Sequence, residues 1–412
     1  MTGMNELHDD HDVNDEDPQA NARSLRWLRR LTATLVVMSI LGVAAAVVPL
    51  PYVARLPGPT VNILGAAATK DGTEELLSIT GTNPLTGEEI KNPDPSTNAD
   101  SGQLRMVTVS EMGGPGRRLN VYGWIQAELT PASELVPYSK VYPDNVTREQ
   151  VDNANKAQMT GSQSTAKVAA LMELGWKVPA TVKITGAVEG SDAQGKLREG
   201  DILQSIETPD GVLHTIETPA DPFAIMRKVA PGSTLKVTVK NGEDQRTETV
   251  VSAASAGETE GSKLGIYLDA QVNLPVDIHF SLENIGGPSA GMMFSLGIID
   301  RLSEGDMTGG KSIAGTGTMS YDGKVGAIGG IAQKMQGAKR DGASWFLAPE
   351  SNCDQVIGHV PEGLRVVRVS TLHEAHERLP QTVGIPFRPA KPSKPKNVRG
   401  RPQLVDSLGK RG

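Results

Sequence analysis

The sequence predicts an α/β protein with a second, mostly β domain and one N-terminal membrane helix. Three observations lead to this fold class. Strand-like and helix-like segments alternate through residues 262–385, which is typical of an α/β domain. Residues 176–252 hold several short strand candidates and one short helix candidate. Leu31–Leu50 contains no charged residue and is long enough to cross a bilayer as a helix.

Length, charge and cysteine content narrow the class of protein. The 412 residues suffice for two or three domains. The formal net charge of -7 argues against a general nucleic-acid role. The lone cysteine, Cys353, excludes a disulfide framework within one chain and any metal site built from several cysteines.

The N-terminal segment predicts a single membrane anchor. Residues 1–30 are expected to form a disordered cytoplasmic terminus that is acidic at first and ends in Arg29 and Arg30. Basic residues on the N-terminal flank of residues 31–50 place that side in the cytoplasm, so the rest of the chain lies outside. A signal peptide cut near Val43–Ala46 is the alternative, but the apolar run is rather long for one.

Residues 51–175 are interpreted as a juxtamembrane segment and the early part of the α/β domain. Strands are predicted at 104–109 and 121–129, with a short helix near 132–136. A long helix is predicted from Thr147, which would cap it, to Leu174.

Residues 176–252 resemble a PDZ domain. The resemblance rests on Gly195–Leu203, where a turn presents Gly200 and Asp201 before a buried strand, and on a helix at 223–229. Such domains bind a peptide as an extra strand at a sheet edge. We expect the preceding loop, Leu174-Gly175-Trp176, to hold a peptide carboxylate. A purely structural PDZ domain without an open groove is the alternative.

A serine in a glycine-framed turn follows the next two predicted strands, 264–268 and 276–280. Gly286, Gly287 and Pro288 precede Ser289, and a long apolar run follows it. Gly287 allows backbone conformations that other residues avoid. Ser289 would then lie at a helix N-terminus, where free N–H groups favour a developing oxyanion. The alternative is a serine that caps a core helix.

A lysine on an apolar helix stripe is the candidate base. Ile331, Met335 and Ala338 share one face of a predicted helix, and Lys334 lies within that stripe. Burial lowers the pKa of a lysine, and only a neutral lysine accepts a proton from serine. The alternative is a lysine whose amine reaches solvent from the edge of the stripe.

These segments resemble the Lon-type serine proteases. Gly287–Gly291 resembles the nucleophile motif, Ile328–Lys334 the segment with the catalytic lysine, and Ala314–Gly317 the segment whose threonine, here Thr316, bonds that lysine. With the anchor and the PDZ-like segment, the chain resembles the membrane-anchored, PDZ-containing Lon-like proteases of Gram-positive bacteria. Many Lon proteases have Asp where this chain has Gly286, so that carboxylate is absent.

Two other motifs are rejected on their context. Gly305–Ser312 matches the phosphate-loop pattern, but a helix precedes it and a strand follows, the reverse of what nucleotide binding needs. Ser289 also fits the nucleophile elbow of α/β-hydrolases, which would need a downstream histidine. His373 and His376 lie in a predicted exposed amphipathic helix. A hydrolase that uses one of them would also leave the position of Lys334 in an apolar stripe unexplained.

The resulting hypothesis is an ATP-independent serine endopeptidase outside the cytoplasm. Ser289 would attack, Lys334 would act as base, and Thr316 and Gly287 would support them. No metal or cofactor is required, and the partners would be protein substrates with exposed termini. The resemblance also implies a homo-oligomer. The Lon-like domain would span 262–385, before a disordered basic tail at 386–412. The alternative function is a non-catalytic, peptide-binding scaffold at the membrane.

Overall fold

The computed structural model describes residues 18–69, 72–92, 102–143, 145–254, 261–282, 285–303 and 307–381. The chain divides into two compact units. The first comprises residues 1–58 and 109–154, and the second comprises residues 59–108 and 155–412. The expected basic tail and the first 17 residues of the expected N-terminal disorder lie outside the described residues.

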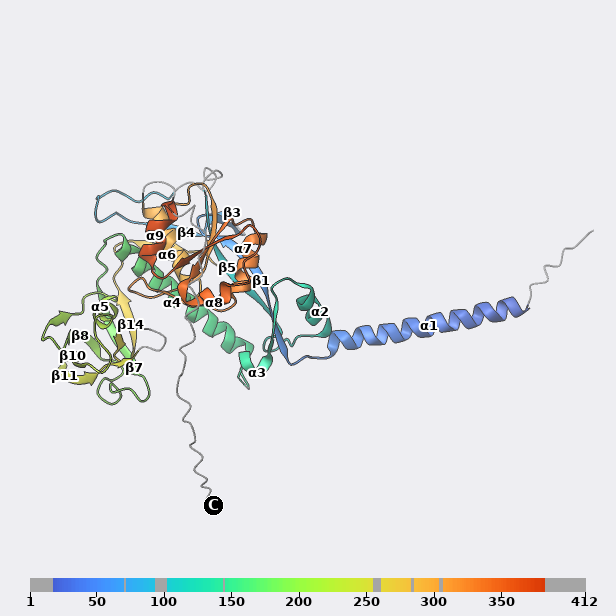
Figure 1. Cartoon of the computed structure of the whole chain (residues 1–412), viewed down its shortest axis with the longest axis horizontal. Coiled ribbons are helices and arrows are strands. Elements are labelled where there is room, and N and C mark those ends of the chain that lie inside the picture. Colours follow the sequence, from blue (N-terminus) through green and yellow to red (C-terminus); the bar gives the residue numbers. More distant parts are fainter. Residues whose placement is uncertain are drawn as a thin grey trace, which may run out of the picture. The chain divides into compact units, whose positions relative to one another are not determined.

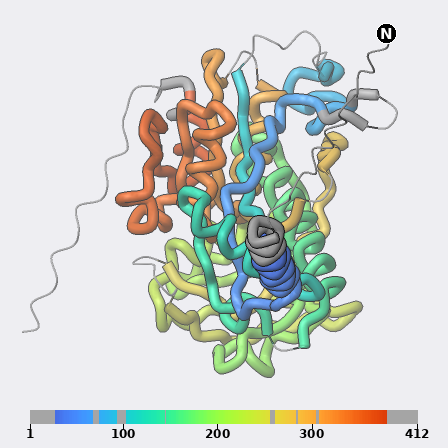
Figure 2. The backbone as a smooth tube through the Cα atoms, turned by 90° about the vertical axis from the view of Figure 1, so that its right-hand side faces the viewer, coloured from blue at the N-terminus to red at the C-terminus, as the bar shows by residue number. Residues whose placement is uncertain are grey.

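A long apolar helix, α1 (Pro18–Val47), dominates the first unit (Figure 1). Its stretch from Trp27 to Val47 has a mean hydropathy of 1.9 and is 0% buried. By length and composition this stretch is suited to crossing a membrane. The helix begins at Pro18, so residues 18–30 are helical where we expected disorder. Figure 2 shows α1 nearly end-on.

Two predictions in the first unit are wrong. Residues 121–129 form a helix, α2 (Val121–Leu129), because the Asn120 side chain caps its first turn by accepting a hydrogen bond from the Gly123 N–H. The segment near 132–136 contains a strand, β6 (Glu134–Pro137), because it pairs with the start of β1 (Tyr52–Asn62). A short helix, α3 (Tyr138–Val141), follows.

The first sheet of the second unit has the strand order β20-β19-β16-β5-β1. Three of its pairings are parallel: β5 with β16, β16 with β19, and β19 with β20. Strands β1 and β5 run from one unit into the other. The bounds are β5 (Gln103–Met112), β16 (Ser312–Gly315), β19 (Trp345–Pro349) and β20 (Arg365–Val369).

Helices cover both faces of this sheet. Alternate strand residues such as Ile313 and Leu347 pack into one core with α4 (Arg148–Glu173), α6 (Gly291–Leu302) and α9 (Leu372–Gln381). Their neighbours Ala314 and Phe346 pack on the opposite face against α7 (Ile331–Arg340). The predicted α/β domain is therefore present as three layers, with α6 and α7 on opposite sides of β16.

A second sheet forms a separate β-rich domain, which we define as residues 180–272. Its strand order is β11-β10-β8-β7-β14, with β9 paired to β8. Helix α5 packs its residues Ile225 and Met226 into the core of this domain. The elements are β7 (Ala180–Ala187), β8 (Ile202–Glu207), β9 (Leu213–Thr215), α5 (Asp221–Met226), β10 (Thr234–Asn241), β11 (Asp244–Val251) and β14 (Ile266–Val272).

The β-rich domain interrupts the chain of the α/β domain. Strand β4 (Leu77–Thr80), before the interruption, pairs with β15 (Asp277–Phe280), after it. The strand predicted at 264–268 as part of the α/β domain instead belongs to the β-rich sheet, because β14 pairs with β7 along its whole length. The remaining elements are β2 (Ala66–Thr69), β3 (Gly72–Glu75), β12 (Ala253–Ala254), β13 (Ser262–Lys263), β17 (Thr318–Met319), β18 (Val325–Gly326), the 3-10 helix η1 (Glu350–Asn352) and α8 (Cys353–Val356).

The core of the α/β domain yields a stability prediction. Phe294 on α6 is 0% exposed, and its ring centroid lies 4.6 Å from that of Phe280. Phe294→Ala should lower the free energy of unfolding by about 3–5 kcal/mol, because it removes buried apolar surface and leaves a cavity. Urea denaturation of the purified chain measures this. The control, Ile357→Ala at a 49% exposed position, should change it by less than about 1 kcal/mol, and equal losses would contradict the packing described.

Candidate active site

Ser289 lies one residue before Ala290, the N-cap of α6, as its sequence context predicts. The turn before it needs glycine, because Gly287 has a φ of +89°. Helix α4 holds this turn at two points. The Gly287 N–H donates to the Asn155 carbonyl at 3.1 Å, and the Ser162 hydroxyl donates to the Pro288 carbonyl at 3.0 Å.

Close packing against α4 also accounts for Gly286. A Cβ atom at this position would lie 2.6 Å from the Cβ of Asn155, which is closer than two non-bonded carbon atoms can approach. A carboxylate side chain at position 286 would therefore force α4 or the turn to move. Glycine at position 286 therefore lets α4 lie close to the turn before Ser289.

Lys334 lies on α7 with its side chain buried, at 3% exposure. Its Nζ is 2.8 Å from Ser289 Oγ and 3.1 Å from Thr316 Oγ1. Desolvation by burial lowers the pKa of Lys334 to about 7. A large fraction of the amine is thus neutral near pH 7, and a neutral amine at this distance is able to accept the serine proton.

Thr316 connects the lysine to the serine backbone. It follows the carboxyl end of β16, between the two faces of the sheet. Its hydroxyl donates to the Ser289 carbonyl at 2.9 Å and accepts from Lys334 Nζ. The Gly317 N–H donates to the same carbonyl at 2.9 Å. The structure therefore brings Ser289, Lys334 and Thr316 together, with Gly287 in the adjoining turn.

Two positioning residues escaped the sequence analysis. Ser162 bonds the nucleophile turn, as described above. Asn352 is 1% exposed, and its side-chain amide bonds both the N–H and the C=O of Ile328, each at 2.9 Å. It thereby fixes the start of the segment that carries Lys334. Neither residue has a local sequence signal, because each acts on a distant part of the chain.

The residues proposed to hold a peptide carboxylate lie elsewhere than expected. Trp176 is 4% exposed and packs in the core of the α/β domain, with Leu174 against it. Gly175 lies with them after the end of α4. These three residues precede β7, and Trp176 and Leu174 pack with the α/β domain core, whereas Gly175 is exposed.

The histidines of the hydrolase alternative are paired with a different residue. His373 Nδ1 and His376 Nδ1 lie 2.9 Å and 3.1 Å from Glu173 Oε1. His373 has a 64% exposed side chain, as expected for the outer face of α9. The group at hydrogen-bond distance from Ser289 Oγ is the amine of Lys334, so the geometry favours the lysine as base.

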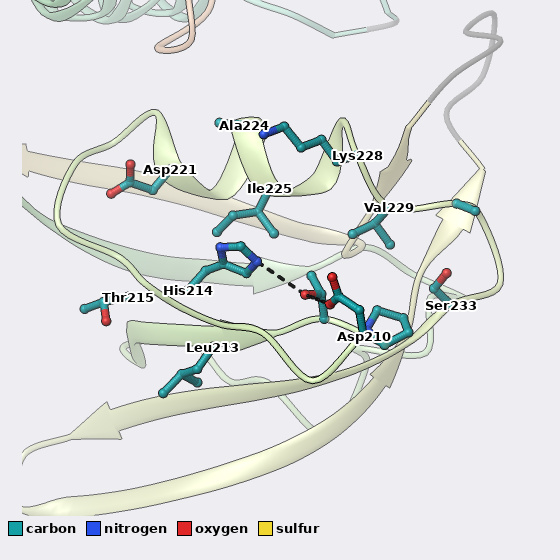
Figure 3. Close-up of a pocket in the computed structure, with 13 residues that line it drawn as sticks. Asp210, Leu213, His214, Thr215, Asp221, Ala224, Ile225, Lys228, Val229 and Ser233 are labelled. Atoms are coloured by element: carbon teal, nitrogen blue, oxygen red, sulfur yellow. Dashed lines mark hydrogen bonds between the residues drawn. The ribbon is translucent and has the colours of Figure 1, made fainter.

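A cavity of about 760 Å³ opens in the β-rich domain, beside α5 (Figure 3). Leu213, Ile225 and Val229 give it apolar walls, and Asp210, Asp221 and Lys228 give it charge. His214 points across it toward Thr208, whose hydroxyl lies 3.3 Å from the imidazole. All of its lining residues belong to the β-rich domain, so this cavity is separate from the Ser289–Lys334 pair.

The opposite side of α5 contacts the α/β domain close to Thr316. The turn between β17 and β18 presents Tyr321 and Asp322, and β17 begins two residues after Thr316. The Arg227 guanidinium lies 3.1 Å from the Asp322 carboxylate. The centroids of the Phe223 and Tyr321 rings are 6.4 Å apart. The short segment from Thr316 to Asp322 therefore contacts the Lys334 amine at one end and the β-rich domain at the other.

Across the described residues, no group of three or more His, Cys, Asp or Glu side chains is placed to hold a metal ion.

Residues 213–380 match the family model of the Lon protease (S16) C-terminal proteolytic domain. Lon protease 2 of Bacillus subtilis is 30% identical over 132 residues, which is 31% of this chain and 22% of that protein. Lon protease 1 of the same organism is 29% identical over 163 residues, which is 38% of this chain and 21% of that protein. The chain thus spans about a fifth of the length of these relatives.

A solved PDZ domain of an SdrC-like protein from Listeria innocua shares 18% identity, with a TM-score of 0.19. The match covers 21% of this chain and 92% of that domain.

The burial of Lys334 predicts a pH-dependent stability. Its pKa is about 7 in the folded chain and about 10.4 when unfolded, so the unfolded state binds more protons between these values. The stability of the wild type should therefore rise with pH across this window. Lys334→Met, which keeps the aliphatic stem, should be more stable below pH 7 by up to about 5 kcal/mol, and this advantage should shrink toward pH 10.

Denaturant unfolding of both proteins from pH 6 to pH 10 measures this difference. Lys339→Met, on the exposed side of the same helix, serves as the matched control. A constant gap between wild type and Lys334→Met at all pH values would show that the amine stays charged in the folded state.

Proposed function

Because the chain contains a Lon-type proteolytic domain, we propose that it is a serine endopeptidase that works without ATP. The observation that carries the proposal is the 2.8 Å separation between Lys334 Nζ and Ser289 Oγ, with the lysine pKa lowered to about 7. A nucleophile paired with a desolvated amine base is the arrangement that acyl transfer to serine needs.

The reaction follows from the positions of the groups. Neutral Lys334 takes the proton of the Ser289 hydroxyl as Oγ attacks the scissile carbonyl, and backbone N–H groups near Ser289 stabilise the oxyanion. The lysine then gives its proton to the leaving amine, and the peptide C–N bond breaks to leave an acyl-enzyme. In the second half, Lys334 takes a proton from water, whose oxygen attacks the ester, and returns it to Ser289 Oγ.

Thr316 orients the base in this scheme. A neutral lysine amine has two N–H donors and one lone pair. When one N–H is directed to Thr316 Oγ1, the lone pair is free to face Ser289 Oγ. The Thr316 hydroxyl donates in turn to the Ser289 carbonyl, so that one side chain fixes both partners.

The anchor would hold the enzyme outside the cytoplasm. Helix α1 would cross the membrane once, with Arg29 and Arg30 on the cytoplasmic side. Everything after Val47 would then face the outside, and the substrates would be proteins of that compartment. Supporting this, the stretch Trp27–Val47 is 0% buried within the protein and is thus free to contact lipid.

The β-rich domain would recruit protein substrates as a PDZ domain does. Strand β14 is one edge strand of its sheet, at the opposite end from β11, and an edge strand offers unpaired backbone groups to an extended peptide. This edge replaces Leu174-Gly175-Trp176 as the proposed peptide site. The domain limits we propose are 180–272 for the PDZ-like domain, with the α/β domain before and after it.

Proteolysis without nucleotide is the direct test. Full-length protein should cleave an unfolded protein such as β-casein in the absence of ATP, and Ser289→Ala and Lys334→Ala should each lower the rate by at least about 10³-fold, because they remove the nucleophile and its base. Gel assays with circular dichroism as a folding check measure this. The control is Ser303→Ala, which changes a serine beyond the other end of α6 and should retain activity.

Three outcomes would contradict the proposal. Proteolysis by Lys334→Ala would favour the alternative of a hydrolase that uses a histidine as base. Cleavage that requires ATP would contradict the nucleotide independence. Peptide binding without any cleavage by wild type would favour the scaffold alternative.

The acylation rate should follow the ionisation of Lys334. Below pH 7 the amine is charged and cannot accept a proton, so kcat/KM should rise about tenfold per pH unit and level off above the lysine pKa of about 7. A fluorogenic peptide assay from pH 5 to pH 9.5 measures the profile. A rate that is constant over this range would exclude Lys334 as the general base.

A further inference from the structure

Helix α2 in the first unit exposes apolar side chains to solvent. Tyr122 is 52% exposed, Ile125 is 43% exposed and Leu129 is 78% exposed. Their spacing of three and four residues places them on one face of the helix, which we call the outer stripe. The inner face is packed, because Ala127 is 0% exposed in a cluster with Leu119. A short helix with a packed inner face and an apolar outer face needs a partner for the latter.

The first turn of α2 is bonded to the last turns of α1. The Tyr122 hydroxyl donates to the Gly42 carbonyl at 3.0 Å, and the Asn120 side chain donates to the Ala46 carbonyl at 3.1 Å. Both helices belong to the same unit, and Figure 1 shows α2 beside the end of α1.

These bonds define the depth of α2 relative to a bilayer. The part of α1 that follows Arg30 and has no charged residue, Leu31–Val47, is about 25 Å long at about 1.5 Å per residue, a little less than the roughly 30 Å of a hydrocarbon core. Gly42 lies five residues before Val47, about 7 Å along the helix axis from its end. If α1 spans the bilayer, the Tyr122 hydroxyl lies within the outer part of the membrane, at the level where acyl chains meet headgroups.

The side chains of α2 suit this boundary. Tyrosine and tryptophan are enriched there, because each has an apolar ring and one polar group. Trp124, 38% exposed, adds a second such ring to the helix, on a different face from Tyr122 because the two are two residues apart. Arg117, which is exposed, precedes the helix and is able to contact anionic headgroups, whereas the neighbouring Arg118 guanidinium stacks on the Tyr138 ring. Interfacial helices bury their apolar face about 5–10 Å deep, which agrees with the depth set by the Tyr122–Gly42 bond.

We propose that α2 is an interfacial helix whose outer stripe contacts lipid at the membrane boundary beside α1. The lipid surface is favoured over a protein partner because the outer stripe adjoins the apolar stretch of α1, which is itself 0% buried. The inference depends on the proposed function in one respect, the placement of α1 across the membrane. A single helix leaves the unit free to tilt and rotate, whereas a second contact with the boundary restricts both motions.

Nitroxide accessibility in vesicles tests the proposal with the full-length protein. Starting from Cys353→Ser, three single-cysteine variants are made, labelled and reconstituted in phosphatidylcholine–phosphatidylglycerol vesicles. Val37→Cys reports on α1, Leu129→Cys reports on the outer stripe, and Leu85→Cys, at a 66% exposed position of the second unit, is the control in water. Collision rates with oxygen and with a water-soluble nickel chelate are then compared.

Oxygen, which partitions into lipid, should dominate at positions 37 and 129, and the nickel chelate should dominate at position 85. The depth from the ratio should be shallower at 129 than at 37. Position 37 in lipid with 129 in water would overturn the interfacial helix and keep the anchor. Shielding of position 129 from both reagents would show that protein covers it and would also overturn the proposal. Position 37 in water would overturn the anchor and this inference together.

Discussion

Removal of water from the Lys334 amine is the constraint on which the rest of the active site depends. An ammonium group at 3% exposure is strongly penalised, and this is why its pKa falls to about 7. A buried amine, even when neutral, also needs hydrogen-bond partners. Ser289 Oγ and Thr316 Oγ1 supply them, at 2.8 Å and 3.1 Å. The same burial that makes the lysine a usable base therefore requires the serine and the threonine to be held in place.

The three layers, a sheet with helices on both faces, hold the serine and the threonine in place at the carboxyl end of β16. Ser289 precedes α6 on one face, Lys334 lies on α7 on the other, and Thr316 follows the strand between them. The layers approach closely here, because a Cβ at Gly315 would lie 2.6 Å from Met293 Sδ. The edge at the carboxyl ends of parallel strands is where α/β proteins commonly place their sites.

Elements outside the segments of Ser289, Thr316 and Lys334 also hold these residues in position. Helix α4 holds the nucleophile turn through Ser162 and the Asn155 carbonyl, and Asn352 fixes the backbone at Ile328. The turn after β17 also touches α5 of the β-rich domain through the Arg227–Asp322 ion pair. A few residues of chain thus join the β-rich domain to Thr316, whose hydroxyl contacts the Lys334 amine. In the first unit, the bonds from α2 to α1 connect the folded part to the apolar helix in a comparable way.

The sequence by itself determined the apolar helix α1 and the alternation of strands and helices, because hydrophobic periodicity is a local property of the chain. It predicted the pairing of Ser289 with Lys334 through the resemblance of two short motifs to Lon-type proteases. It failed at α2, where the Asn120 cap and burial of Ala127 outweighed a strand-like composition, and at β14, whose partner β7 lies some 80 residues earlier. Only the tertiary structure decided that α4 approaches closely enough to require glycine at position 286, that Asn352 holds Ile328, and that Trp176 fills a core. Each of these depends on contacts between segments far apart in the sequence, and no local pattern records a contact of that kind.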